Sequence, residues 1–159
     1  MAEEKASSEQ EQARFVIQKI YTKDISFETP NSPDIFRAEW QPKLDLQMSN
    51  EYVRIDDDNH EITLVVTVTA KVDDKVAFLA EVKQAGIFSL TGYSDQEMGP
   101  LIGSYCPNTL FPFAREVISD IVLKGGFPQL VLAPVNFDAL YMNQLEQAKK
   151  QAADKATTH

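Results

Sequence analysis

Reactive side chains are scarce in this chain. Among its 159 residues there are one cysteine, Cys106, and two histidines, His60 and His159. A single cysteine cannot form a disulfide within the chain, and these few sulfur and imidazole groups supply no zinc-ligand set. The six glycines form no phosphate-binding loop, because Gly125 and Gly126 stand where a predicted helix ends rather than where one begins.

Long apolar runs are also absent, and none approaches the ~20 residues that a membrane helix needs. The first residues, MAEEKASSEQEQ, are acidic and polar, the reverse of the basic and apolar order of a signal peptide. These two absences predict a soluble, cytoplasmic protein with no direct membrane insertion. Positive charge is scarce too, since 15 Lys and Arg stand against 24 Asp and Glu, for a net charge of −9. Such an acidic body repels nucleic acid and favours basic partners.

The segment 15–40 is the feature around which the rest of the chain is organised. Its odd positions from 15 to 27 read Phe, Ile, Lys, Tyr, Lys, Ile and Phe, whereas Asp24 and Glu28 fall on even positions. Side chains alternate faces along a strand, so Asp24 and Glu28 are predicted on one face, with Ile25 and Phe27 on the other. This pattern is typical of a sheet with one buried and one solvent-exposed face.

Three more strands and then helices are predicted along the chain. The second strand carries an irregularity around Ser49 and Asn50, and Ser94 with Glu97 three residues later forms a capping box that opens the first helix. Gly99-Pro100 and the later Pro107 make that helix short or kinked. The strands are expected at 15–28, 44–55, 61–72 and 76–88, and the helices at 94–102, 107–124 and 136–147.

Strands followed by helices indicate the α+β class, with a four-stranded antiparallel sheet and helices packed on one face. Residues 14–147 are expected to form this single domain, between a disordered acidic tail at 1–13 and a flexible C-terminal tail at 148–159. The fourth strand is mildly apolar on both faces. Self-association is therefore expected.

Two candidates for chemistry are weak. Asp56, Asp57, Asp58 and His60 crowd one turn, but a calcium loop needs a glycine at its sixth position and a glutamate at its twelfth, so a solvated hairpin turn is favoured. Cys106 has no histidine near it in sequence, and a packing thiol is favoured over a nucleophile, although a helix N-terminus could lower its pKa.

Large apolar side chains on proline-broken segments are the remaining anomaly. A core beneath long loops explains them, and so does an elongated apolar groove, because exposed apolar surface beyond a few hundred Å² marks binding sites. The pattern alone leaves both explanations open. The residues are Ile35, Phe36, Trp40, Leu44, Leu46 and Met48 in one region, and Phe127, Leu130 and Leu132 in another.

Four stretches resemble the SecB preprotein-export chaperones. The resemblance covers residues 14–145 and implies a homotetramer, a dimer of dimers, with no catalytic activity and no cofactor. It implies an ATP-independent chaperone (holdase) that keeps secretory preproteins unfolded in the cytoplasm and delivers them to SecA, whose basic, zinc-containing C-terminal tail is the docking partner. The stretches are QKIYTKDISFETPNSPDIFRAEWQP from Gln18, QAGIF from Gln84, YCPNTLFPFARE from Tyr105 and FPQLVLAPVNFDAL from Phe127.

The resemblance also implies three sets of site residues. The client-binding groove maps to Phe36, Trp40, Leu44, Leu46, Met48, Tyr141, Met142 and Leu145. The SecA-docking face maps to Asp24, Glu28, Leu79 and Glu81. The oligomer interface maps to Ala80, Val82 and Gln84.

Two alternatives stay open. One is a SecB-like chaperone of a toxin–antitoxin system. The intact set at positions 24, 28, 79 and 81 favours export over this alternative. The other is a small-molecule binder or hydrolase that uses the apolar groove with Cys106 nearby. Thiol reactivity separates this enzyme hypothesis from a chaperone.

Overall fold

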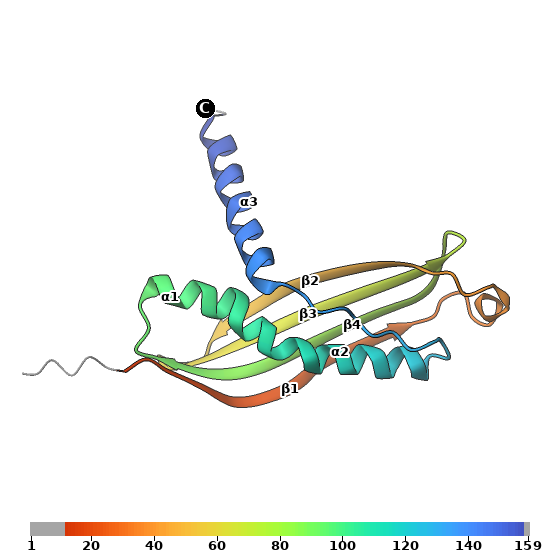
Figure 1. Ribbon diagram of the computed structural model, residues 1–159, viewed down its shortest axis with the longest axis horizontal. Coiled ribbons are helices and arrows are strands. Elements are labelled where there is room, and N and C mark those ends of the chain that lie inside the picture. The colour runs from red at the N-terminus through yellow and green to blue at the C-terminus, as the bar shows by residue number, and fades with distance from the viewer. Residues whose placement is uncertain (1–11, 158–159) are drawn as a thin grey trace, which may run out of the picture.

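The computed structural model describes residues 12–157, so the expectation of a disordered tail at 1–13 falls mostly outside the described residues. One antiparallel sheet has the strand order β1-β4-β3-β2, which places β1 and β2 at its two edges (Figure 1). A helical layer covers one face of this sheet, hereafter the helix face, and the opposite side is the far face. The predicted α+β architecture is confirmed. The strands are β1 (Arg14–Glu28), β2 (Lys43–Arg54), β3 (Asn59–Val72) and β4 (Lys75–Thr91).

The helical layer begins where the sequence predicts it. Ser94 and Glu97 form the expected capping box, and Gly126, with φ of +88°, lies just past the end of the main helix, where a left-handed residue favours glycine. A short 3-10 turn in the loop after β1 was not predicted. The helical elements are η1 (Asp34–Arg37), α1 (Asp95–Pro100), the π-helical turn η2 (Leu101–Tyr105), α2 (Cys106–Lys124) and α3 (Phe137–Thr157).

The first two helices are joined through η2 rather than separated by a break. Pro107 has no N–H to donate to the carbonyl of Gly103 four residues earlier. That carbonyl instead accepts a hydrogen bond from Asn50 Nδ2 at 3.4 Å. The wide π-helical turn and this outside donor let the chain continue helically past Pro107.

The face alternation of β1 is interrupted twice. The pairing with β4 shifts between Ile17 and Lys19 and again between Thr22 and Asp24, and each extra residue moves the following side chains to the opposite face. Lys19 and Tyr21 therefore lie on the far face, so the strict odd–even prediction is wrong in the middle of the strand. Past the second shift it is confirmed.

The irregularity predicted in β2 is absent from the structure. Ser49 pairs with Val65 and Asn50 with Leu64 in an unbroken register with β3. The polar pair was misread because β2 is an edge strand, where polar side chains are exposed without any break in pairing.

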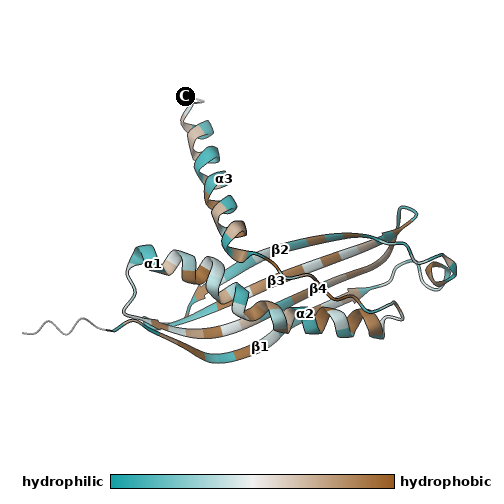
Figure 2. Cartoon of the chain, viewed as in Figure 1, coloured by the Kyte–Doolittle hydropathy of each residue, from teal (hydrophilic) through white to brown (hydrophobic). Residues whose placement is uncertain are grey.

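The core lies between the helix face and α2, and its buried side chains are at most 7% exposed. Four α2 residues at a spacing of four form a stripe on one side of the helix. They pack on alternate residues of β3 and β4, which appear as apolar bands in Figure 2. The stripe is Leu110, Ala114, Ile118 and Val122.

The predicted oligomer-interface residues belong to this core. Ala80 and Val82 are 0% exposed and Gln84 is 2% exposed, and the Gln84 side chain accepts a hydrogen bond from Thr22 at 2.8 Å. These side chains are thus buried within the protomer, and their role in an oligomer interface stays a prediction. Their positions face the protomer's own α2, because even-numbered β4 residues point toward the helix layer.

The last helix, α3, projects away from the sheet (Figure 1). It continues to Thr157, so the segment expected as a flexible tail from 148 is helical through 157, and residues 158 and 159 lie outside the described part. Asn136 accepts a hydrogen bond from Ala139 N at 3.0 Å and caps the helix as predicted. Within residues 12–157, no helix is long and apolar enough to cross a membrane.

Candidate binding surfaces

An aromatic cluster closes the loop end of the sheet. Trp40 packs against Phe78 and Phe127, with ring centroids 6.4 and 5.3 Å apart, and Phe36 lies 5.1 Å from Phe127. Phe78 and Phe127 are buried, Trp40 is half-buried and Phe36 is 49% exposed. Both explanations for the apolar loops are thus partly right, because the inner rings are core and the outer ring is surface.

An open apolar strip continues from this cluster along β2. Leu44 and Leu46 project from the helix face and are 49% and 39% exposed, and Met48 is half-buried. They stay uncovered because β2 is an edge strand while α2 lies over β4, β3 and β1. We call Phe36, Leu44, Leu46 and Met48 the apolar strip.

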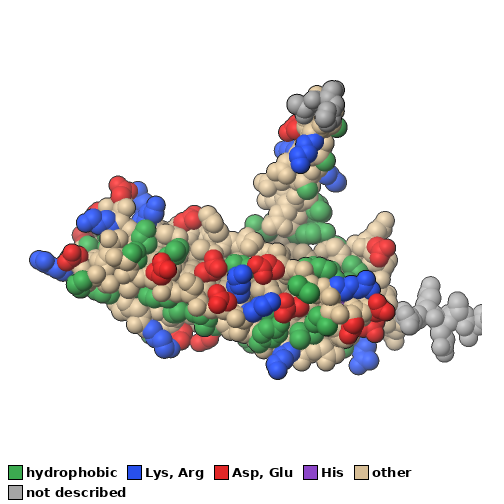
Figure 3. All heavy atoms as spheres, turned by 180° about the vertical axis from the view of Figure 1, so that it is seen from behind, with side chains coloured by type: hydrophobic (Ala, Val, Ile, Leu, Met, Phe, Trp, Pro, Cys, Tyr) green, Lys and Arg blue, Asp and Glu red, His purple; other side chains and the backbone are tan. Residues whose placement is uncertain are grey.

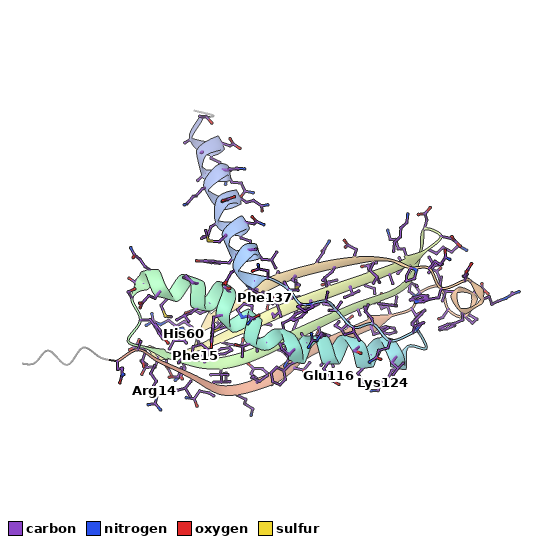
Figure 4. The ribbon with its side chains drawn as sticks, in the orientation of Figure 1. Arg14, Phe15, His60, Glu116, Lys124 and Phe137 are labelled. Carbon is purple, nitrogen blue, oxygen red and sulfur yellow. The ribbon has the colours of Figure 1, made fainter. Side chains whose placement is uncertain are left out.

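The base of α3 meets the far end of this strip. A small crevice there is lined by Met48, Asn50, Leu64 and Gly103, together with Phe137, Leu140 and Gln144 of α3. Figure 4 shows Phe137 at the foot of the helix, where it is buried. Leu140 was missing from the predicted groove, although its place three residues after Phe137 in the apolar stripe of the helix was a signal that could have found it.

Tyr141, also predicted in the groove, packs against the helical layer. Its ring lies against Gly99 and Gly103, on the side of η2 rather than over β2. Met142 and Leu145 are 55% and 39% exposed, on the part of α3 that stands away from the sheet.

The far face brings the predicted docking residues together. Glu28 pairs with Leu79 and Ser26 with Glu81 across β1 and β4, and Asp24 lies opposite Lys83. Leu79 is 37% exposed. We call Asp24, Glu28, Leu79 and Glu81 the acidic set; it lies on the side seen in Figure 3, where acidic side chains are spread among apolar and basic ones.

Charge pairing on the far face leaves much of the acidic set unneutralised. Lys83 pairs with Glu51 at 3.2 Å, and Lys23 pairs with Glu61 at 2.8 Å. Glu61 also accepts from the Tyr21 hydroxyl, and the hydrogen bonds from Lys23 and then Tyr21 lower its pKa. Among residues 12–157, neither Asp24 nor Glu28 is in a salt bridge, so their charge is available to a basic partner.

Cys106 is fully buried at the start of α2, and burial raises its pKa to about 12. The thiol is therefore predicted to be inert in the native protein. At pH 8 its thiolate should be roughly two thousandfold scarcer than that of a free cysteine with a pKa near 8.5. Labelling with a thiol reagent should be slow in buffer and fast in denaturant. Rapid labelling of the native protein would contradict this prediction and revive the nucleophile hypothesis.

His60 is buried rather than solvated, which corrects the prediction for this end of the hairpin turn. Its Nδ1 shares a 2.6 Å hydrogen bond with the Tyr52 hydroxyl, and the Tyr52 ring stacks on it. His60 begins β3 on the helix face, near Phe15 in Figure 4, whereas the aspartates before it are exposed. The three aspartates made His60 look like part of an exposed turn. Its burial was missed because the first inward-facing position of β3 comes directly after that turn.

Burial, with Arg54 nearby, lowers the pKa of His60. The unfolded chain then binds the proton more readily, so stability is full above the ordinary histidine pKa of about 6.5 and falls as the pH drops below it. When the pH is lowered from about 7.5 to about 5.5, the urea midpoint of unfolding should decrease more in the natural protein than in His60→Phe. Equal decreases in both proteins would show that His60 is not the group responsible.

An open apolar strip on one face and an acidic set on the other are typical of binding proteins, and the fold is of the α+β class. A family model described as "Preprotein translocase subunit SecB" matches residues 8–148. The chain belongs to the SecB family.

Curated relatives agree with this assignment over almost the whole chain. The chain is 59% identical to the "Protein-export protein SecB" of Nitrosococcus oceani, over 94% of this chain and 93% of the relative. It is 52% identical to the protein of the same name from Methylococcus capsulatus, over 96% and 97%. The chain is accordingly a preprotein-export chaperone of a non-enzymatic family, as the sequence predicted.

A solved structure is similar in fold. It is the SecB-like chaperone of Mycobacterium tuberculosis in complex with a peptide from an antitoxin, with a TM-score of 0.64, 15% identity and coverage of 77% of this chain and 91% of that one. At this identity the likeness concerns the fold alone.

Proposed function

We propose that the protein is an ATP-independent holdase that keeps secretory preproteins unfolded in the cytoplasm and delivers them to SecA. The observation that carries the proposal is the apolar strip, which lies open along an edge strand beside a half-exposed aromatic cluster. An unfolded client presents apolar side chains at many places, and a long shallow strip accepts them without one fixed geometry. Met48 at its end suits such adaptable contacts.

The acidic set is proposed as the docking face for the basic, zinc-containing tail of SecA. It lies on the far face, so a client on the helix face and SecA on the far face do not compete for the same surface. Exposed Leu79 among the carboxylates supplies an apolar contact, and the charges favour a basic partner through the rate of encounter.

Self-association as a homotetramer, a dimer of dimers, is proposed through the outer side of α2 rather than through the β4 core residues. Tyr105 of η2 is 54% exposed, and Phe113 and Leu123 of α2 are 47% and 57% exposed. Val131 of the following connector lies near Leu123 and is 65% exposed. Such a set of exposed apolar residues along the helical layer is typical of a surface covered by another subunit. Native mass spectrometry should give about 72 kDa, four copies of 17.9 kDa.

A refolding assay tests the holdase proposal. A destabilised secretory precursor is diluted from denaturant with and without the protein, in the absence of ATP, and its folding is followed in time. The protein is expected to slow folding in proportion to its concentration until each client is bound. Unchanged folding kinetics at a large excess would lead us to abandon the proposal.

Glu81→Lys is expected to weaken binding of the isolated SecA tail by about tenfold or more, because it reverses one charge and removes the acceptor of the 3.0 Å hydrogen bond from Thr67. Asp58→Lys is the matched control, since it makes the same change of charge on an exposed turn at the other end of the sheet. Calorimetric titration measures both. An equal loss of affinity for the SecA tail in both variants would show that overall charge, not this face, is responsible. Unchanged affinity in Glu81→Lys would exclude this docking face and favour the chaperone of a toxin–antitoxin system.

A further inference from the structure

Tyr141 sits in a notch that only glycines leave open. A Cβ added to Gly99 would lie 2.6 Å from the Tyr141 hydroxyl, and one added to Gly103 would lie 2.4 Å from ring atom Cδ2. Contacts below 3.0 Å are essentially never adopted by real Cβ atoms. The two glycines are four residues apart and present one flat side of the helical layer to the ring.

The notch belongs to a joint that occupies only the first turn and a half of α3. Phe137 is buried and packs edge-on against Phe111, with centroids 5.6 Å apart. Ser104, next to the notch, donates a hydrogen bond to Asp138. Beyond Tyr141 every described residue of α3 is exposed, so this joint alone fixes the direction of the helix.

The same joint determines which side of α3 faces β2. Phe137, Leu140 and Gln144 follow one another at helical spacing and line the crevice against Met48. Tyr141 is turned by about 100° from Leu140 around the helix axis, toward the glycines. The Gly103 carbonyl also accepts the hydrogen bond from Asn50 of β2, which ties the notch to the strand that carries the apolar strip.

We infer that Tyr141 is a positioning residue, whose ring in the Gly99–Gly103 notch holds α3 so that Leu140 and Gln144 stand at the end of the apolar strip as client contacts. This inference deepens the proposed function. Its statement about client contacts rests on the proposal that the protein is a holdase. The groove residue expected at 141 is thereby replaced by its neighbours at 140 and 144.

The direction of α3 is measured by double electron–electron resonance between spin labels at Gln151→Cys on α3 and Asp45→Cys on β2, with labelled protein diluted by unlabelled protein. Buried Cys106 stays unlabelled. The natural sequence and Tyr141→Phe should give one narrow distance distribution, since phenylalanine keeps the ring. Tyr141→Ala should broaden it, and Glu146→Ala, an exposed control on the same helix, should not.

Gly103→Ala completes the design through a double-mutant comparison. Gly103→Ala should broaden the distance distribution when Tyr141 is present. In Tyr141→Ala it should cause little further broadening, because the added methyl group then meets no ring. Client affinity should fall about three- to tenfold in Tyr141→Ala, as the positioned state becomes less populated, and remain unchanged in Tyr141→Phe. Gln144→Ala, which lies beyond the joint and is exposed, should weaken client binding without broadening the distances.

A narrow distribution in Tyr141→Ala would overturn the inference. If client affinity then fell, Tyr141 would be a direct client contact after all. Failure of the natural protein to bind any client would contradict the proposed function instead, while the distance measurements would still decide whether the joint exists.

Discussion

Phe78→Ala is expected to lower the free energy of unfolding by about 3–5 kcal/mol, the usual cost of deleting a buried phenylalanine. Phe78 is 1% exposed and contacts Phe27, Trp40 and Phe127, with centroids 5.9, 6.4 and 5.2 Å away. Its loss leaves a cavity among three rings that come from different segments. Urea unfolding followed by circular dichroism measures the change.

Phe36→Ala is the matched control, because it removes a phenylalanine from the outside of the same cluster. Phe36 is 49% exposed, and among the described residues the one aromatic ring it packs on is Phe127, so a cost of about 1 kcal/mol is expected. Similar costs for the two variants would mean that Phe78 is not the centre of this cluster.

Leu44→Ser combined with Leu46→Ser should weaken client binding by about a hundredfold, since each leucine contributes roughly 1.5 kcal/mol when a client covers it. The fold should change little because both side chains are already 39% or more exposed. Fluorescence titration with a labelled unfolded precursor gives the affinity, and the thermal midpoint reports the fold.

Asp45→Ser with Gln47→Ser is the control for the leucine variant. These residues alternate with the leucines on the same strand and point to the far face. Client affinity should stay within about twofold of the natural protein, a change of under 0.5 kcal/mol. A comparable loss in both double variants would show that clients do not distinguish the two faces of β2.

The sheet, the start of the first helix and the end of α2 could be predicted from local rules, whereas the extension of α3 to Thr157 was not. The capping box at Ser94, the stop at Gly125-Gly126 and the alternation of β3 each depend on residues that are neighbours in sequence. Asp24 and Glu28 were placed on the correct face for the same reason, since no shift in register falls between them.

The features that were missed depend on distant partners. The shifts in β1 are defined by its pairing with β4, and no single-strand pattern reveals them. His60 is buried because of what covers the end of the sheet. Tyr141 packs on the helical layer because two glycines some forty positions earlier open a notch. The burial of Ala80, Val82 and Gln84 beneath α2 was not predicted either, because a strand apolar on both faces does not reveal which face its own helix covers.

The hydrogen bond from Asn50 to the Gly103 carbonyl has an evolutionary consequence. It is needed because Pro107 leaves that carbonyl without its helical donor. Positions 50 and 107 are thus expected to vary together: a relative with an ordinary residue at 107 satisfies the carbonyl within its own helix and is free to replace the asparagine. An edge-strand residue and a helix proline, 57 positions apart in the chain, would then change as one unit of selection.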